Sequence, residues 1–521
     1  MLKLQERSLK WALNHALEYG DTDIFPVPFE FEAIKHDWEN ILRWLKDINI
    51  LEWTTRPFRR SLTPKNRFGF RISTQLDPID YLIYTALVYE IGTEIEERRV
   101  PIERNIVHSY RFRPEKNGKF YNESLNFGTF TNAARDNVET GKFSYVIIAD
   151  ISDFFAKLYS HRLENALRSA TSKTNHVKAL INIMSQWNEH FSYGIPIGPS
   201  ASNLLSEIAI DDVDRILLSE GKNYVRYSDD FRIFCTSYRD AHETLALLAH
   251  DLFENHGLTL QQSKTKIITV ERFNDEYLRG VEHHELDTLS NRFYEIIAKI
   301  GLDNPYDPID IDDLEPSVQQ EIVNLNLEEI LQEQISNEEL DIPITKFILR
   351  RLAQLEYDVV DLILENVDKF YPVFKDVVKY ISSLSNLREE ERHYLGERLL
   401  NLLSSESIVS HLEFHRQWIL SLFIKDTEWN NVYRFVELYN KFEDPYSRRK
   451  IVLSLGRAQQ EHWFRSKKRY LFDFNTWLKR AIIAGGSCLP TDERKHWYQS
   501  LESRLDPLEK AVVKWAKSNP F

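Results

Sequence analysis

Apolar side chains fall at every second position through residues 224–234, before and after an adjacent pair of aspartates. This alternation is typical of β-strands, so the segment predicts a hairpin with Asp229 and Asp230 at its tip. Two neighbouring carboxylates repel each other, and a fold keeps them together when a cation lies beside them. Because Asp is also common in ordinary tight turns, the pair needs support from elsewhere in the chain.

A second carboxylate follows a continuous apolar run. Residues 145–149 read as a buried strand with Asp150 at its end, an arrangement that holds a metal ligand rigidly. A helical pattern then runs through Leu158 and Leu163. Asp153 is placed to cap this helix, whereas Asp150 comes too early for that role. We therefore expect Asp150 to be the metal ligand.

A loop rich in glycine and proline, residues 194–203, lies between these two carboxylate positions. It leads into a helical pattern with apolar residues at steps of three and four as far as Leu217, and Gly221 ends the pattern. Glycine allows a backbone to approach a ligand closely. Taken alone, the segment is better interpreted as an ordinary loop and helix start.

These three segments, taken in order, resemble the palm of reverse transcriptases. The resemblance extends to five motifs, A to E, which correspond to residues 150–155, 194–203, 227–230, 256–265 and 277–280. It covers roughly the first half of the chain. No single motif is specific, but five in the right order and spacing are.

The fingers region of that family also has a counterpart upstream. Phe70-Arg71-Ile72 with Asp77-Pro78 matches the motif that supplies an arginine to the incoming nucleotide. Two motifs depart from the usual pattern. Motif B reads Pro196-Ile197-Gly198 where Pro-Gln-Gly is common, and motif E lacks Phe-Leu-Gly.

The resemblance implies a nucleotidyltransferase, an RNA-directed DNA polymerase that joins dNTPs with two Mg²⁺ ions, for which Mn²⁺ is a substitute. Asp150 and Asp229 would bridge both ions as catalytic ligands. Asp230 would be an additional catalytic carboxylate, and the carbonyl of Ile151 would complete the metal site. Hard oxygen donors of this kind suit Mg²⁺.

The resemblance also implies which residues contact the nucleotide. Phe155 takes the position of a steric gate, where an aromatic ring excludes a ribose 2′-hydroxyl. Lys264 either meets the leaving pyrophosphate or is an ordinary solvated lysine. The nucleotide-binding set is Lys65, Arg71, Asp153, Phe154, Phe155, Pro196, Gly198, Ser202, Tyr227 and Lys264, and the primer or product contacts are Leu278 and Gly280.

Three segments look like the reverse transcriptases of bacterial antiphage defence and abortive infection: the Pro196-Ile197-Gly198 motif, residues 20–26 and residues 108–112. This subgroup implies a homo-oligomer that acts in antiviral defence. Its partner is a noncoding RNA template, or single-stranded DNA made without a template and primed from a protein hydroxyl. A catalytically silent RNA-binding scaffold is one alternative, against which the intact aspartates argue. A retron- or intron-type enzyme is another, against which the long helical tail argues.

The chain as a whole is expected to have an α+β fold of right-hand polymerase type. Residues 1–50 read as a helical extension, 51–285 as fingers and palm, and 286–345 as an acidic linker. Between 301 and 345 there are 13 Asp or Glu and no Lys or Arg. Residues 346–521 are helical in pattern, which predicts an all-α domain of HEAT-like repeats. Because no strict sequence repeat is present, a plain helical bundle is the alternative.

The net charge of −14 over 521 residues argues against general affinity for nucleic acid. Two basic stretches, 53–71 and 448–469, are exceptions, and the second also contains aromatic residues that stack on unpaired bases. A solvated helical face is the alternative for the second stretch. The two cysteines lack metal-ligand spacing, and no apolar run has spanning length. We expect a cytoplasmic bacterial protein with no membrane association.

Overall fold

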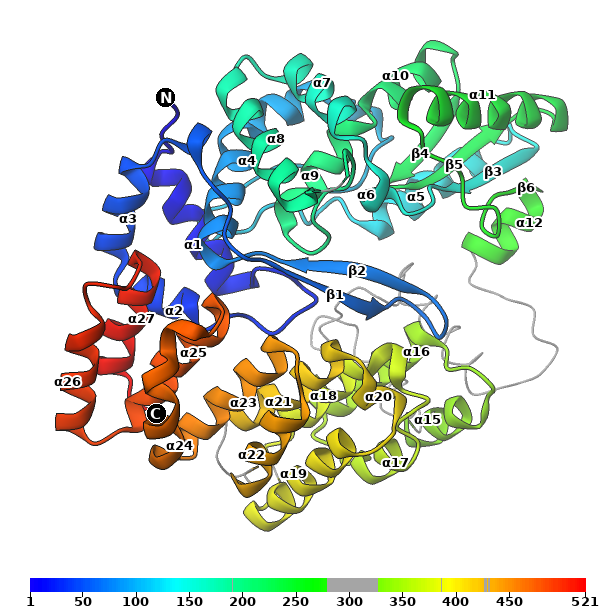
Figure 1. Ribbon diagram of the computed structural model, residues 1–521. Helices are drawn as coiled ribbons and strands as arrows, with labels where there is room; N and C mark the ends of the chain where they lie inside the picture. Colours follow the sequence, from blue (N-terminus) through cyan, green and yellow to red (C-terminus); the bar gives the residue numbers. More distant parts are fainter. Residues whose placement is uncertain (190, 279–326, 386, 426–428, 430–431) are drawn as a thin grey trace. The chain divides into compact units, whose positions relative to one another are not determined.

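The computed structural model describes residues 1–189, 191–278, 327–385, 387–425, 429 and 432–521 (Figure 1). The chain forms two compact units. The first comprises Met1–Tyr19, Asn49–Thr55 and Asp80–Ile330, and the second comprises Gly20–Ile48, Arg56–Ile79 and Leu331–Phe521. Gly280 and most of the acidic segment 286–345 lie outside the described residues. Among the residues that are described, no helix is long and apolar enough to cross a membrane.

A four-stranded antiparallel sheet organises the first unit, with the strand order β4-β5-β3-β6. The strands are β3 (Tyr145–Asp150), β4 (Asn223–Tyr227), β5 (Asp230–Cys235) and β6 (Lys266–Thr269). β4 and β5 form the hairpin that the alternating pattern predicts. The register of β3 and β5 places Asp150 directly opposite Asp230, so strand pairing alone brings two distant carboxylates to one end of the sheet.

Helices pack against this sheet and fix its position in the unit. One apolar core joins Val146, Ile148 and Phe234 of the strands to Phe130 of α5 (Phe127–Glu139). β-Branched and aromatic residues suit such a half-buried pleated surface. Helix α11 (Tyr238–His256) packs against β3, β5 and β6, beside the sheet in Figure 1. The strand ends that carry the aspartates are thus set on a rigid, covered sheet.

Two predicted helices of the first unit are interrupted. The helix expected through Leu217 is divided at Ile210, after which three acidic residues in one turn favour a new helix N-terminus. The helix expected through Leu158 and Leu163 is also divided, because the backbone is extended at Leu158 and its carbonyl accepts a hydrogen bond from Gly194. The remaining elements are α1 (Glu6–Tyr19), η1 (Ile50–Glu52), α4 (Pro78–Arg98), η2 (Ile102–Arg104), α6 (Phe154–Lys157), α7 (Ser160–Ala170), α8 (Thr174–Asn188), α9 (Ser200–Ala209), α10 (Asp211–Ser219), α12 (Val270–Phe273) and the π-helix η3 (Asn274–Leu278).

The second unit combines a β-hairpin with many helices. Strands β1 (Arg59–Pro64) and β2 (Phe70–Gln75) pair antiparallel, with Leu62 opposite Ile72. The helices are α2 (Glu30–His36), α3 (Trp38–Asp47), α15 (Leu327–Ser336), which begins in the first unit, α16 (Ile342–Gln354), α17 (Val360–Glu365), η5 (Tyr371–Val373), α18 (Phe374–Ser383), α19 (Glu389–Ser404), α20 (Ile408–His411), α21 (Glu413–Lys425), α22 (Val432–Lys441), α23 (Pro445–Arg457), α24 (Glu461–Lys467), η6 (Lys468–Asp473), α25 (Thr476–Gly485), η7 (Gly486–Cys488), α26 (Thr491–Leu501) and α27 (Pro507–Ser518).

The C-terminal helices form a continuous series of packed neighbours. Helix α16 packs on α18, α18 on α21, α21 on α23, α23 on α25 and α25 on α27. No strand occurs among the described residues from 331 to 521, so the predicted helical C-terminal region is present. Packing of successive helices along a series is the arrangement of helical-repeat proteins.

Buried ion pairs tie the two early segments of the second unit to its C-terminal helices. The guanidinium of Arg480 lies 2.9 Å from Glu30 and 2.7 Å from Asp77, and all three side chains are fully buried. Arg449 also pairs with Glu30. The compact units therefore combine segments that lie far apart in the sequence, whereas the domain boundaries expected from the sequence follow chain order and stay a prediction.

Candidate active site

Three carboxylates gather at one end of the sheet in the first unit. Asp150 ends β3, Asp230 begins β5, and Asp229 lies in the turn between β4 and β5. The backbone N–H of Ile151 donates to the carbonyl of Asp229 over 3.2 Å. This bond joins the two carboxylate-bearing segments directly, so the positions predicted from the alternating pattern and from the buried strand meet in the structure.

Asp229 is a weaker acid than an ordinary aspartate. Burial and the nearby charges of Asp150 and Asp230 raise its pKa to about 6 from an ordinary value of 3.8, and Lys264 opposes the shift. A carboxylate with a raised pKa beside two others is a site where a cation relieves repulsion. A bound cation would therefore stabilise the ionised form of Asp229.

The predicted motif D lysine lies on the first of these carboxylates. The ammonium of Lys264 is 2.7 Å from Asp150 Oδ2. Burial disfavours the lysine charge, but the hydrogen bond and charge of Asp150 outweigh it and raise the pKa of Lys264. The same loop binds the Asp150 backbone, since the N–H of Gln261 donates to the Asp150 carbonyl over 2.7 Å. Lys264 therefore pairs with Asp150 while its side chain is about half exposed, and its role toward pyrophosphate stays a prediction.

A second cation neutralises Asp230. The guanidinium of Arg232 lies 3.0 Å from Asp230 Oδ1, two residues along the same strand. Within the described residues, no three Asp, Glu, His or Cys side chains converge on one point in the way a metal cluster does. The physical reason is that Asp150 and Asp230 each turn toward a cationic side chain in this structure.

The donor set nevertheless fits a hard divalent ion. Asp150, Asp229 and Asp230 offer carboxylate oxygens on adjacent rigid elements, and oxygen ligands are what Mg²⁺ prefers. Their mutual repulsion, seen in the raised pKa of Asp229, is the feature that a divalent cation would remove. Ile151, the fourth predicted ligand, is buried immediately after Asp150.

The predicted nucleotide gate is tied to the glycine and proline loop. Phe155 is half-buried on α6, and its carbonyl accepts a hydrogen bond from the N–H of Ile195 over 3.0 Å. Phe154 is buried and packs edge-on against Phe155. Gly198 has a φ of 136°, a conformation that side chains disfavour. The loop and the aromatic residue are therefore held together in one unit.

Three other predicted nucleotide contacts are largely interior residues. Pro196 is buried, and Ser202 is fully buried with its hydroxyl sharing a 3.0 Å hydrogen bond with the hydroxyl of Tyr84. Tyr227 is half-buried and packs edge-on against Phe127. Their roles in nucleotide binding stay predictions.

Asp153 takes the predicted N-cap position but does not cap the helix as expected. It precedes α6 with a left-handed backbone (φ 50°), and its side chain makes no capping hydrogen bond. A side chain in this conformation does not reach the helix amides as an extended N-cap residue does. The exposed carboxylate lies 3.6 Å from Lys157 instead.

The remaining predicted contacts lie elsewhere. Arg71 and Lys65 are exposed on the β1–β2 hairpin of the second unit, Arg71 in β2 and Lys65 at the turn. Leu278 is a member of the apolar core beneath the sheet, and its carbonyl accepts from Arg135. Gly280 lies outside the described residues.

Sequence reasoning missed several residues around the aspartates. Arg226 of β4 and Arg232 of β5 are both buried. A buried guanidinium requires an acidic partner, so two arginines flanking an Asp-Asp turn were the available signal. The partners themselves, such as Glu207 for Arg226, lie too far along the chain to be chosen by spacing.

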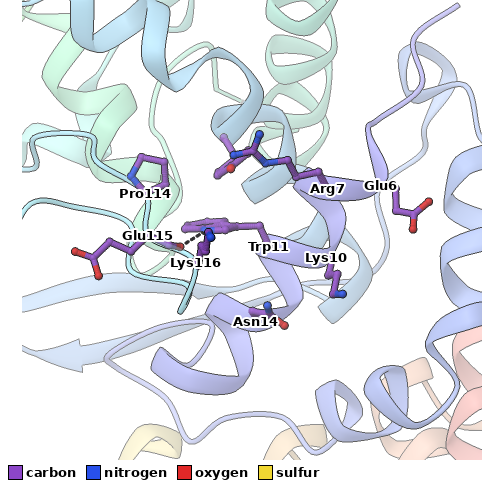
Figure 2. Close-up of a pocket in the computed structure, with 9 residues that line it drawn as sticks. Glu6, Arg7, Lys10, Trp11, Asn14, Pro114, Glu115 and Lys116 are labelled. Carbon is purple, nitrogen blue, oxygen red and sulfur yellow. Dashed lines mark hydrogen bonds between the residues drawn. The ribbon is translucent and has the colours of Figure 1, made fainter.

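A pocket of about 510 Å³ lies elsewhere in the first unit, and Figure 2 shows the residues that line it. Trp11 forms part of its wall and donates a 2.7 Å hydrogen bond to the carbonyl of Glu115. The ring of Trp11 is buried against Tyr89 and Phe120. Acidic and basic side chains are mixed around the pocket, and none of the predicted site residues lines it. We therefore do not include it in the active site.

The family model described as "Reverse transcriptase (RNA-dependent DNA polymerase)" matches residues 68–323. The chain contains a reverse transcriptase domain. Such a domain makes the protein a nucleotidyltransferase, an RNA-directed DNA polymerase, and domains of this family use divalent metal ions. The predicted α+β fold of fingers and palm followed by a helical C-terminal region is confirmed. The matched residues include Asp150, Asp229 and Arg71 but not Lys65.

Solved structures of telomerases are among those similar to this reverse transcriptase. One is telomerase from Candida albicans in complex with a TWJ fragment of telomeric RNA, with 10% identity, a TM-score of 0.31, and coverage of 76% of this chain and 71% of that chain. Another is apo telomerase from Candida tropicalis, with 11% identity, a TM-score of 0.31, and coverage of 81% and 73%. A comparison with curated proteins found no match. These likenesses carry no argument about substrate or partner.

Proposed function

We propose that this reverse transcriptase joins dNTPs at a two-metal centre held by Asp150 and Asp229, with Asp230 as an additional ligand, and that it acts in bacterial antiviral defence. The observation that carries the catalytic part is the cross-strand pairing of Asp150 with Asp230, which places Asp229 beside both. The raised pKa of Asp229 is consistent with the same assignment, because burial and the charges of Asp150 and Asp230 both disfavour its ionised form.

The chemistry divides between the ions and the protein. Two Mg²⁺ ions, when bound, stabilise the attacking hydroxyl oxygen and the leaving oxygen of pyrophosphate. Asp150, at the end of β3, and Asp229, in the turn between β4 and β5, would hold the ions. Lys264, which pairs with Asp150 in this structure, is able to exchange that partner for the departing pyrophosphate. A lysine ammonium carries its charge near neutral pH with either partner.

We assign nucleotide contacts to Phe155, whose backbone is hydrogen-bonded, and to the exposed Arg71 and Lys65. Phe155 is fixed by the bond from Ile195 to its carbonyl, and a ring so fixed would exclude a ribose 2′-hydroxyl. Arg71 is exposed between Phe70 and Ile72, two apolar residues that are also about half exposed. An exposed guanidinium binds phosphate oxygens through charge-assisted hydrogen bonds. We propose that Arg71 and Lys65 bind the triphosphate.

The defence role rests on sequence likeness. Three segments look like those of bacterial antiphage reverse transcriptases: the Pro196-Ile197-Gly198 motif, residues 20–26 and residues 108–112. The proposal includes a noncoding RNA template, a single-stranded DNA product and a homo-oligomeric state. It is tested by phage challenge of bacteria that express the protein. Fewer plaques with the wild type than with Asp229→Asn are expected, and equal plaque counts would contradict the role in defence.

Labelled dNTP incorporation by the purified protein tests the catalytic proposal. Asp229→Asn should lose incorporation, whereas Asp136→Asn, an isosteric change at an exposed aspartate of α5, should retain it. Loss of synthesis after ribonuclease treatment would identify an RNA template. A product whose mobility shifts on protease treatment would identify protein priming. Incorporation that survives in Asp229→Asn would overturn the assignment of the metal ligands.

A further inference from the structure

The turn that presents Asp229 has an unfavourable backbone conformation. Ser228, the residue directly before Asp229, has a φ of 55° and is buried. Residues other than glycine seldom adopt this left-handed region, and they remain in it when surrounding groups restrain them. Because the chain direction at Asp229 follows from the backbone of Ser228, whatever restrains Ser228 also places the Asp229 carboxylate.

Both backbone polar groups of Ser228 are bound by side chains from other elements. Its N–H donates to Ser109 Oγ over 2.8 Å, and its carbonyl accepts from Arg226 Nη1 over 2.8 Å. Ser109 follows residues 106–108, whose backbone pairs with Arg226 of β4. The turn is therefore held from both sides.

Both restraining side chains lead to one buried carboxylate. Glu207 of α9 accepts from Ser109 Oγ over 2.6 Å and from Arg226 Nη1 over 3.0 Å. Arg99 donates to Glu207 over 2.6 Å and to the carbonyl of Ser109 over 2.8 Å. Ser109, Glu207 and Arg226 are each at most 1% exposed. Charge-assisted hydrogen bonds in such an interior are strong and directional.

We propose that Ser109 and Glu207 are positioning residues for Asp229, acting through the backbone of Ser228. Neither side chain is placed to touch substrate. They fix the direction in which the turn carries the Asp229 carboxylate, while the bond from Ile151 to the Asp229 carbonyl fixes the same residue relative to Asp150. This inference rests on the proposed role of Asp229 as a metal ligand.

The decisive variant is Ser109→Ala, which removes the acceptor for the Ser228 N–H and one donor to Glu207. Its matched control is Ser206→Ala. Ser206 is equally buried, lies next to Glu207 on α9, and bonds only locally, to the Asn203 carbonyl over 2.8 Å. Glu207→Gln, which keeps the side-chain volume, gives the same test if Ser109→Ala does not fold.

The readouts are kcat, the half-saturating Mg²⁺ concentration for dNTP incorporation, and the unfolding temperature. Ser109→Ala is expected to lower kcat or apparent metal affinity by about 10- to 100-fold, as loss of groups that orient metal ligands does. Its unfolding temperature should fall somewhat below that of Ser206→Ala, because the buried Ser228 N–H loses its acceptor, so the Mg²⁺ requirement is the readout that decides. A merely structural role would lower the unfolding temperature and leave the Mg²⁺ requirement unchanged.

Asp229→Asn distinguishes failure of the metal-ligand assignment from failure of the positioning role of Ser109. If Asp229→Asn is inactive and Ser109→Ala has the same kcat and Mg²⁺ requirement as Ser206→Ala, the positioning role is overturned and the metal-ligand assignment stands. If Asp229→Asn is active, the metal-ligand assignment fails first. Inactive Asp229→Asn together with a raised Mg²⁺ requirement in Ser109→Ala supports both.

Discussion

Asp150 and Asp230 face each other across the register of β3 and β5, although 80 positions separate them in the sequence. Directly opposed residues in an antiparallel pair have neighbouring Cβ atoms, and like charges there are destabilising. The structure offsets this repulsion with Lys264 on Asp150 and Arg232 on Asp230. A divalent ion that binds these carboxylates would compete with both side-chain cations.

Replacement of Lys264 by alanine should raise the apparent affinity for Mg²⁺ while it lowers kcat. Lys264→Ala removes the cation on Asp150, so the half-saturating Mg²⁺ concentration is expected to fall. It also removes the proposed partner of the pyrophosphate, so kcat is expected to fall by about 10²-fold. Steady-state incorporation over a Mg²⁺ titration measures both. Lys266→Ala, at an exposed lysine of β6, is the control, and a raised Mg²⁺ requirement in Lys264→Ala would contradict the competition.

The raised pKa of Asp229 predicts a pH-dependent stability in the absence of metal. Because the folded-state pKa of about 6 exceeds the ordinary 3.8, ionisation of Asp229 destabilises the folded protein. This cost is absent below about pH 4, grows between about pH 4 and 6, and is complete above that range. Asp229→Asn should therefore stabilise the metal-free protein at about pH 8, by at most about 3 kcal/mol, and not at about pH 4.

Unfolding in a chelator at the two pH values checks this, with Asp136→Asn as the control. With Mg²⁺ at about pH 8, the wild type should become more stable to unfolding than Asp229→Asn, because an ion that binds only the folded wild type stabilises it. An Asp229→Asn variant that is no more stable than the wild type in the chelator would show that the carboxylates do not repel as described.

Phe155 should govern the choice between deoxynucleotides and ribonucleotides. Phe155→Ala removes the half-buried ring while leaving the backbone bond from Ile195 in place. The ratio of kcat/KM for a dNTP over the matching rNTP is expected to fall by about 10- to 100-fold. Phe130→Leu, a change at a buried ring of α5 that is not in the predicted nucleotide-binding set, should alter stability without altering this ratio. An unchanged ratio in Phe155→Ala would contradict the assignment of Phe155 as the steric gate.

The buried arginine of α25 should be essential to the stability of the second unit. Arg480→Ala leaves Glu30 and Asp77 buried without their shared partner, and such a loss costs about 3–5 kcal/mol. Arg469→Ala, at an exposed arginine nearby, should change the free energy of unfolding by less than about 0.5 kcal/mol. Urea denaturation compares the two, and equal effects would show that the ion pairs contribute nothing to folding.

The sequence was informative where the signal is local. Alternation around Asp229 and the apolar run before Asp150 follow from strand geometry, and the antiparallel sheet brings both to one end. Contacts with no local signature were not foreseeable. Arg480 meets Glu30 and Asp77 across more than 400 residues, and nothing in residues 20–79 marks them as part of the helical unit. The helix break at Ile210, by contrast, has a local signal in the acidic residues Asp211, Asp212 and Asp214, which the apolar periodicity alone does not register.

The account's central claim is that Asp150 and Asp229 hold the catalytic metal ions. Anomalous diffraction from crystals grown with Mn²⁺ and a dNTP tests it directly. The account predicts Mn²⁺ peaks bridged by the Asp150 and Asp229 carboxylates, with the Lys264 ammonium moved away from Asp150. Peaks confined to other carboxylates, or a Lys264–Asp150 pair that persists with no Mn²⁺ beside it at saturating metal, would contradict it.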